Sequence, residues 1–419
     1  MPSKCPWDLR AEATSALTET FPIVKTLISD AESWDITRLP MKILLVNDTI
    51  GARGGVQTYL DLLKESLEGR GHAVELFGPR RESRPSDYLK GVWNIASWLR
   101  LRRKTREFRP DVIHYFGIGR YHSASVLFPG RKARRVMSFR DTHLCCPETW
   151  LVRRSGAACS GIGWTCLNGG CYRSAIRLKY LLYHYLNLPI LALHRLLIKL
   201  RVQAFITNSG YMAALFQESL QVNRITVLPH FIRKSDLRFE RLRHTKIVLY
   251  IGRLSPEKGV EIALRAFPKV LQRVPEAKLV IAGSGPILET LRRRAEELSI
   301  SDRVDFAGWV EKPETTYSGA DVVIIPSICQ DAFPWAALEA MSRGRPVIAG
   351  EVGGLPEIIE PGRNGYLFPL GDSAALADRI VALLTDEIAL EAFSKKAFEK
   401  ANTYREDNHY DHLLRIYRS

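Results

Sequence analysis

The sequence predicts an α/β protein made of two tandem, doubly wound parallel-sheet domains that face each other across a cleft. Short apolar runs, each typical of a buried parallel strand, alternate with stretches whose apolar residues recur at helical spacing. A glycine-rich loop joins the first strand to the first helix, as in the strand–helix–strand unit of such sheets. The same alternation begins again at residue 247, and a length of 419 residues suits roughly two to three domains.

The first domain is expected over residues 41–232. Its first strand is the apolar run at 42–46, the glycine loop follows, and an amphipathic helix begins at Val56. Further strands are predicted at 73–77, 110–115 and 135–139. Residues 1–40 show no clear strand or helix rhythm, so we interpret them as an N-terminal extension; the alternative is a docked helix over 8–30.

The second domain is expected over residues 233–400, and the polar, basic stretch at 231–245 is expected to link the two domains. Its strands are predicted at 247–252, 278–283, 304–308, 321–326 and 346–349, and its first helices at 259–273 and 287–298. Residues 401–419 are expected to form a C-terminal helix that can cross back to the first domain. Because ligands of open parallel sheets bind beyond the carboxyl ends of the strands, we expect a ligand in the cleft between the domains.

Composition excludes several classes of protein. With 46% hydrophobic and 25% charged residues, the chain is neither disordered nor fibrous. It has no apolar run long enough to span a membrane and no apolar segment typical of a secretory signal, so we expect a cytoplasmic protein. The net charge of +15 is uneven: residues 1–40 carry −2, residues 41–232 carry +17, and residues 233–419 carry none. The central block therefore indicates an anionic partner.

A series of motifs orders the second half of the chain. They are GRLSPEKG at 252–259, AGSGP at 282–286, FAGWV at 306–310, DAFPWAALEAM at 331–341, GRPVI at 344–348, GGLPE at 353–357 and GRNG at 362–365. In this order and spacing they resemble the donor domain of glycosyltransferase family 4. That resemblance implies the GT-B fold, with two Rossmann-like domains, and a retaining transfer of sugar from a nucleotide-sugar donor.

The resemblance also implies a catalytic group made of Arg253, Lys258 and Asp331. Cleavage of a sugar nucleotide builds negative charge on its diphosphate, and two cations beside a helix N-terminus can stabilise that charge without a metal ion. A solvated pair of loop cations is the alternative reading of Arg253 and Lys258. The family carries Glu, seven residues, then Glu, whereas this chain has Asp331 and Glu339. The first position is therefore still acidic, but the side chain of Asp331 is one methylene shorter than that of glutamate.

Further donor-binding residues follow from the same motifs. Glu339 matches the family position that binds the ribose hydroxyls, a role that suits a carboxylate; an exposed glutamate at a helix start is the alternative. Gly353 and Gly354 would let the backbone approach the phosphates, although an ordinary turn is also consistent with them. The complete predicted donor-binding set is Gly252, Arg253, Lys258, Gly283, Val310, Phe333, Leu338, Glu339, Gly353 and Gly354.

The first half resembles the family's acceptor domain more loosely. Its predicted acceptor and cleft residues are Gly54, Gly55, His114, Asp141 and His143. Family members commonly show His-Asp ahead of Cys-Pro, and here Arg140-Asp141 precede Cys146-Pro147. Arg140 thus replaces the histidine, and whether His143 substitutes for it stays open. A lone histidine such as His114 is more often structural than functional.

Cysteines gather in one glycine-rich segment at 145–171. Four of them, Cys146, Cys159, Cys166 and Cys171, could hold a structural zinc ion. Their spacing lacks paired Cys-x-x-Cys motifs, so reduced thiols packed in a loop, or disulfides, are the alternatives. No cofactor is expected for catalysis.

Residues 174–201 mix leucine and tyrosine with arginine and lysine, a pattern typical of a helix on an anionic membrane surface. Pro189 would kink or split this helix, and packing against its own domain is the alternative. The charge of the central block favours the membrane.

Together these features predict a cytoplasmic glycosyltransferase at the inner face of the membrane, acting in polysaccharide biosynthesis. Its partners would be a nucleotide-sugar donor, a lipid-linked or glycan acceptor and an anionic membrane surface. A non-catalytic sugar-nucleotide-binding protein of the same fold is the alternative. Nucleic acid is not an expected partner, because the basic block lacks a recognisable binding module.

Overall fold

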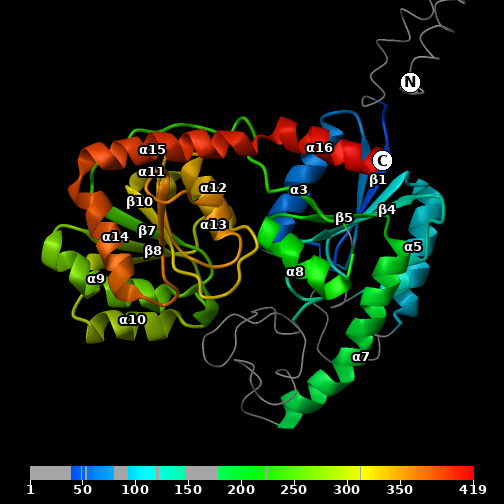
Figure 1. Ribbon diagram of the computed structural model, residues 1–419, viewed down its shortest axis with the longest axis horizontal. Coiled ribbons are helices and arrows are strands. Elements are labelled where there is room, and N and C mark those ends of the chain that lie inside the picture. The colour runs from blue at the N-terminus through cyan, green and yellow to red at the C-terminus, as the bar shows by residue number, and fades with distance from the viewer. Residues whose placement is uncertain are drawn as a thin grey trace, which may run out of the picture. The chain divides into compact units, whose positions relative to one another are not determined.

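The computed structural model describes residues 39–48, 50–51, 54–79, 93–118, 122–146, 178–222, 224–311 and 313–419, with backbone only over 178–188. Most of the predicted N-terminal extension, residues 1–38, lies outside this part of the chain. The described body from Met41 onward contains two parallel six-stranded sheets flanked by helices (Figure 1). The prediction of doubly wound α/β architecture is confirmed.

The first sheet has the strand order β2-β1-β3-β4-β5-β6, and all of its pairings are parallel. Its strands are β1 (Lys42–Val46), β2 (Ala73–Phe77), β3 (Val112–Tyr115), β4 (Arg134–Phe139), β5 (Ala204–Thr207) and β6 (Thr226–Val227). Its helices are α3 (Gly55–Glu68), α5 (Ile95–Phe108), η2 (Ala124–Leu127), α7 (Leu178–Arg201) and α8 (Gly210–Leu220). All of β1 after Lys42 is buried, as its continuous apolar run requires.

The second sheet has the order β12-β11-β10-β7-β8-β9, also parallel throughout. Its strands are β7 (Ile247–Ile251), β8 (Lys278–Ala282), β9 (Val304–Gly308), β10 (Val322–Ile325), β11 (Val347–Gly350) and β12 (Gly365–Phe368). Its helices are η4 (Pro256–Lys258), α9 (Val260–Arg273), α10 (Leu288–Glu297), η5 (Ser301–Arg303), α11 (Pro313–Gly319), α12 (Trp335–Met341), α13 (Leu355–Ile358), α14 (Ser373–Thr385) and α15 (Glu387–Ala401).

The strand order reverses at one place in each sheet. In the first sheet β2 lies on one side of β1, and β3 lies on the other side. In the second sheet β8 lies on one side of β7, and β10 lies on the other side. Loops diverge at such a point and leave room beyond the strand ends, where ligands of open sheets bind. The loops after β1, β3, β7 and β10 are therefore the places to look for a site.

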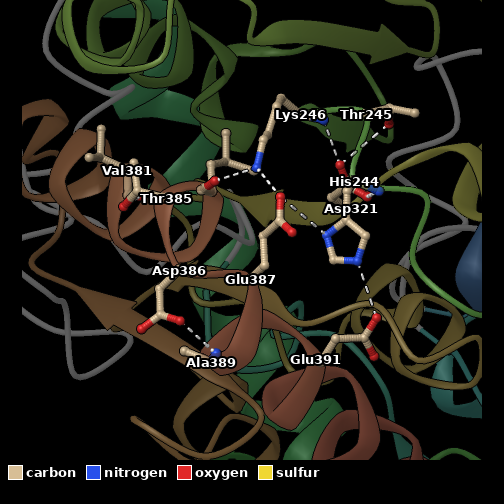
Figure 2. A network of polar contacts seen from close by, with 11 residues as sticks. His244, Thr245, Lys246, Asp321, Val381, Thr385, Asp386, Glu387, Ala389 and Glu391 are labelled. Atoms are coloured by element: carbon tan, nitrogen blue, oxygen red, sulfur yellow. Dashed lines mark hydrogen bonds and ion pairs between the residues drawn. The ribbon is translucent and has the colours of Figure 1, made fainter.

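A buried aspartate fixes the entry into the second sheet (Figure 2). Asp321 accepts hydrogen bonds from the backbone N–H groups of His244 (3.0 Å) and Lys246 (2.6 Å), which both have positive φ. The Lys246 ammonium then donates to the carbonyl of Leu384 (2.8 Å) and to Glu387 (3.1 Å). The start of β7 is thus tied to the α14–α15 junction. These contacts lie at the amino end of the strand, opposite the carboxyl ends at which ligands of open sheets bind.

The last segment returns to the first half of the chain. After η6 (Asn402–Tyr404), helix α16 (Glu406–Arg418) lies against α3 (Figure 1). Tyr59 of α3 shares a hydrogen bond of 2.7 Å with His409, and Arg70 pairs with Glu406 at 2.7 Å. Leu413, Leu414 and Tyr417 join the same buried cluster as β1.

Helix α7 continues from Leu178 to Arg201 with Pro189 inside it. It is one helix, so of the two outcomes expected at this proline, a kink or a split, the split does not occur. A proline removes one N–H and crowds the preceding turn, which can bend a helix without ending it.

Candidate functional site

Tight glycine packing places the loop after β7 directly against its neighbours. A Cβ on Gly259, which has φ +66°, would lie 1.9 Å from the carbonyl oxygen of Pro326 in the loop after β10. A Cβ on Gly283, after β8, would lie 1.8 Å from the carbonyl oxygen of Gly252. Only glycine fits such contacts. The structure therefore gives Gly252, Gly259 and Gly283 a role in bringing three loops together at the strand ends.

Lys258 and Asp331 meet where the loops after β7 and β10 touch. The ammonium nitrogen lies 2.6 Å from Oδ1 and 2.8 Å from Oδ2 of the carboxylate, and Ser327 donates to Oδ2 at 2.8 Å. Burial alone would raise the pKa of Asp331, but Lys258 and these hydrogen bonds lower it below its usual value. Burial alone would lower the pKa of Lys258, but the nearby Asp331 outweighs burial and raises that pKa above its usual value. Both groups are charged at neutral pH, so the predicted catalytic residues form a partly buried ion pair.

Arg253 belongs to the same loop but has a different environment. Its side chain is 65% exposed, and its guanidinium pairs at 2.5 Å with the buried carboxylate of Glu257. Ser255 donates to the same carboxylate oxygen at 2.6 Å. Glu257, which sequence reasoning missed, thus orients an arginine that stays open to solvent. Its place inside the GRLSPEKG motif was the available signal.

The glycine pair at 353–354 closes the site from the α13 side. The N–H of Gly354 donates to the carbonyl of Asp331 at 2.8 Å, and the N–H of Gly353 donates to the side chain of Gln330 at 2.9 Å. A Cβ at either glycine would lie about 2 Å from the carbonyl of Asp331 or Ala332. The predicted pair does lie beside Asp331, and its smallness is required for the approach.

Glu339 lies on α12, eight residues after Asp331. It accepts a hydrogen bond of 2.8 Å from the Tyr317 hydroxyl, and burial raises its pKa in spite of that bond. Phe333 is buried in the apolar cluster that also contains Tyr317, and the half-buried Val310 packs against this cluster. Leu338 is fully buried in the core of the second sheet. Its side chain therefore packs in the protein interior, because the apolar face of α12 covers β10 and β11.

The glycine loop of the first half touches α12. The indole N–H of Trp335 donates to the carbonyl of Gly55 at 3.0 Å, and a Cβ on Gly55 would lie 2.9 Å from that ring. Gly54 precedes it with φ +149° as the N-cap of α3. Sequence reasoning missed Trp335, although it lies within the DAFPWAALEAM motif.

The predicted cleft histidine His114 lies elsewhere. Its side chain is fully buried, and its two ring nitrogens are each 2.7 Å from a hydroxyl, that of Tyr417 and that of Ser138. Burial and the nearby Arg140 hold its pKa well below the ordinary value. Its inward position on the central strand β3 makes it a core residue that binds α16, so the structure supports the structural reading.

Asp141 and His143 do line a cavity, in the loop after β4. An Asp141 carboxylate oxygen accepts from the N–H of His143 at 3.0 Å. The adjoining Arg140 is buried and donates to His230 at 3.0 Å. His230 stacks on Trp335 with ring centroids 4.5 Å apart. This chain of contacts joins the predicted acceptor-side loop to α12, and its only signal in the sequence was the departure at Arg140.

Within the described residues, no group of three or more His, Cys, Asp and Glu side chains could hold a metal ion. Cys146 is buried there. The other three predicted zinc ligands, Cys159, Cys166 and Cys171, lie outside the described part of the chain. No described helix is long and apolar enough to cross a membrane.

Comparison with known proteins follows the same division of the chain. The model of glycosyltransferase family 4 matches residues 53–235, and that of glycosyl transferases group 1 matches residues 234–400. An uncharacterized glycosyltransferase of Methanocaldococcus jannaschii is 37% identical over 180 residues, 41% of this chain and 45% of that protein. The aligned segments span less than half the length of the first curated relatives.

A longer match and a solved structure cover most of the chain. The GDP-mannose-dependent alpha-(1-6)-phosphatidylinositol monomannoside mannosyltransferase of Mycobacterium tuberculosis is 27% identical over 382 residues, 82% of this chain and 89% of that protein. The structure of Anabaena HepE in complex with UDP and glucose has a TM-score of 0.66 at 19% identity, covering 90% of this chain and all of that one. The two family matches together extend over residues 53–400, and the chain belongs to the family 4 glycosyltransferases of the GT-B fold.

Proposed function

We propose that the protein is a retaining glycosyltransferase that moves a sugar from a nucleotide-sugar donor to an acceptor hydroxyl. The observation that carries the proposal is the Lys258–Asp331 ion pair at the reversal of strand order in the second sheet. Similar proteins support it: one is named as GDP-mannose-dependent, and another was solved with UDP and glucose.

The arrangement suits cleavage of a sugar–diphosphate bond. As the bond from the anomeric carbon to the phosphate oxygen breaks, the diphosphate gains negative charge, which Lys258 and the exposed Arg253 would stabilise. With retention, the acceptor oxygen bonds to the anomeric carbon on the face that the diphosphate leaves, and its proton passes to the diphosphate. These protein cations supply charge that a metal ion would otherwise supply, so we propose catalysis without a metal.

Asp331 has two roles in this proposal. Its carboxylate keeps Lys258 ionised and oriented within the half-buried site. Its oxygens also offer acceptors for hydroxyl groups of the donor sugar and stabilise positive charge at the anomeric carbon. Both roles need an anion, and the shorter aspartate side chain provides one.

Nucleotide recognition is assigned to the surrounding residues. Glu339 would accept hydrogen bonds from the ribose hydroxyls, and the backbone at Gly353 and Gly354 would lie against the phosphates. Val310 and Phe333 would contact the base or the sugar from the neighbouring loops.

The acceptor is proposed to be a lipid-linked or glycan molecule held at the inner face of the membrane. A surface formed by α5 and α7 supports this, and we call it the α5–α7 surface. Both helices pack on η2, and Phe128 contacts Trp93 before α5 and Arg201 at the end of α7. Exposed apolar side chains lie on the two helices, namely Ile95, Leu99, Leu193, Leu196 and Leu200.

The basic charge of the α5–α7 surface indicates an anionic membrane as its partner. The basic residues of α5 include Arg100, Arg102, Arg103 and Arg106, and α7 ends in Lys199 and Arg201. Apolar side chains beside a basic rim fit the interface of an anionic membrane. Vesicle pelleting tests this: Leu196→Glu and Leu200→Glu should release the protein, whereas Ile388→Glu, at an 87% exposed site on α15, should not.

The function is tested by purified protein with a panel of nucleoside-diphosphate sugars. Binding of one donor should raise the melting temperature, and the same donor should be consumed in transfer or slow hydrolysis. Lys258→Ala should abolish turnover. Lys269→Ala, which removes an exposed ion pair between α9 and Asp378 of α14, should leave turnover unchanged. Binding without any turnover would favour the alternative, a non-catalytic sugar-nucleotide-binding protein.

A further inference from the structure

A small cavity lies at the carboxyl ends of the central strands of the first sheet. It has a volume of about 30 Å³ and is lined by Asp48 after β1, Phe116 and Gly117 after β3, and Arg140, Asp141 and His143 after β4. Since roughly 10–15 Å³ holds one water molecule, the cavity admits a group the size of a carboxylate.

The most unusual residue of this cavity is Arg140. It is only 6% exposed, and its guanidinium lies over the ring of Tyr59 at 3.6 Å from the ring centroid. Its Nη1 donates to His230 at 3.0 Å. Its Nε and Nη2 are buried and have no hydrogen-bond partner within the described part of the chain.

Arg140 makes no ion pair with a carboxylate among the described residues, although Asp48 and Asp141 line the same cavity. The three histidines around it, His114, His230 and His409, have lowered pKa values, partly because of its charge, and are neutral. The Tyr59 ring offsets part of the cost of burying the cation. A buried cation with two unused donors is still expensive, and an oxyanion would satisfy it.

The polar groups around the cavity already have defined partners, with one exception. Asp48 accepts from the N–H of His122 at 2.8 Å, and Asp141 accepts from the N–H of His143 at 3.0 Å. The buried Nδ1 of His143 has no hydrogen-bond partner in the described residues. The unused hydrogen-bonding capacity of the cavity therefore lies on Arg140 and His143.

Arg140 is also close to the proposed reaction site. His230 connects it to α12, stacking on Trp335 and meeting Phe333 edge-on with centroids 5.4 Å apart. Phe333 is two residues from Asp331. A group that enters the cavity thus belongs to a molecule lying near the donor sugar.

We propose that Arg140 binds an anionic oxygen group, a carboxylate or a phosphate, carried by a substrate of the transfer reaction. The inference rests on the proposed function and specifies its substrates: one of the two carries an acidic group in addition to the diphosphate of the donor. The group comes either from a carboxylated donor sugar or from a phosphorylated acceptor, and the chemistry at Arg140 is the same.

Calorimetric titration of the full chain tests the donor source. The probes are UDP, UDP-glucose and UDP-glucuronic acid, together with the guanosine pair GDP and GDP-mannose. We expect wild type to bind the carboxylated donor at least tenfold more tightly than UDP-glucose, as one charge-assisted contact allows. Arg140→Gln should abolish that preference, and Arg140→Lys should retain part of it.

Titration with inorganic phosphate in the presence of UDP or GDP tests the acceptor source. Phosphate should raise the melting temperature of wild type and of Arg140→Lys, but not of Arg140→Gln. The matched control is Arg135→Gln, because Arg135 is a buried arginine of β4 whose Nη2 donates to the carbonyls of Pro129 and Gly130. It should leave both anion effects unchanged.

The outcomes separate the two proposals. Loss of either anion effect in Arg140→Gln, with nucleotide binding kept, supports the inference and identifies the source. Equal affinity for neutral and acidic probes in wild type, with no response to phosphate and normal nucleotide binding, overturns it. Failure of every nucleotide to bind wild type contradicts the proposed function instead.

Discussion

The indole N–H of Trp335 donates a hydrogen bond to the carbonyl of Gly55, a residue 280 positions earlier in the chain. The contact joins the first helix of the first sheet to the helix that follows Asp331. It depends on the missing side chain at residue 55, because a Cβ there would lie 2.9 Å from the indole.

Gly55→Ala should therefore displace Trp335. We expect a loss of turnover of tenfold or more with a stability change of about 1–3 kcal/mol, the usual cost of overpacking. Steady-state kinetics and urea denaturation measure the two effects. Gly319→Ala is the control, since nothing lies within 4 Å of a Cβ at that position. Unchanged kinetics in Gly55→Ala would show that the contact does not position the site.

Asp331→Asn should keep the fold and much of the nucleotide affinity while turnover falls by roughly a hundredfold or more, as when a preorganised electrostatic group is removed. Asp331→Glu keeps the charge that pairs with Lys258 and should be tolerated better. Transfer rates and donor dissociation constants for both variants decide this. Near-normal transfer by Asp331→Asn would leave Asp331 with a packing role.

Glu339→Gln should act on binding rather than on the chemical step. Its neutral amide still meets the Tyr317 hydroxyl but is a poorer partner for two ribose hydroxyls than a carboxylate. We expect the dissociation constant of the nucleotide to rise about tenfold, with little change in kcat. Tyr317→Phe is the companion variant, and an unchanged affinity in Glu339→Gln would exclude the ribose contact.

Transfer should survive EDTA, because Arg253 and Lys258 supply the positive charge at the diphosphate. Activity is measured before and after dialysis against the chelator, with magnesium or manganese added back. A Cys166→Ser variant controls for zinc elsewhere in the chain. Restoration of lost activity by either divalent ion would contradict the proposed role of the two cations.

Acid should destabilise the protein through its buried histidines. Burial, aided by Arg140, lowers the pKa of His409 to about 3, below its ordinary 6.5. Between these values the unfolded state binds more protons, so the free energy of unfolding rises with pH and is lost on acidification. From pH 7 to pH 5 we expect His409 alone to contribute a loss of about 2 kcal/mol. His409→Gln, compared by urea denaturation at both pH values, should show a smaller loss than wild type.

Strands formed by long apolar runs were predictable from the sequence, and others were not. The runs that became β1 and β7 have no other stable place than a buried parallel sheet. Strand β5 (Ala204–Thr207) and the two-residue β6 were missed, because four or fewer residues of mixed polarity carry no clear period. Their positions are decided by strand pairing, of β5 with β4 and of β6 with β5, which is a tertiary effect.

The candidate site divides in the same way. Lys258 and Asp331 were predictable because each lies inside a motif read as a unit. Arg140 and His230 were not, since their contact spans 90 residues and neither lies in a motif that describes the other. His114 occupies the right strand, but no pattern in the sequence shows that α16 covers it. Sequence places residues on strands, whereas only packing decides which side chains remain open.

The return of α16 to the first sheet sets the order in which the protein can mature during translation. Leu413, Leu414 and Tyr417 complete the apolar cluster that holds Ile43, Leu45 and Tyr59. The ribosome makes the early members of this cluster hundreds of residues before the late ones. One face of the amino-terminal sheet therefore stays partly uncovered until residue 417 has left the ribosomal exit tunnel. Expression of residues 41–232 by themselves would yield a chain lacking part of its own core, so a workable split protein needs α16 supplied with the first piece.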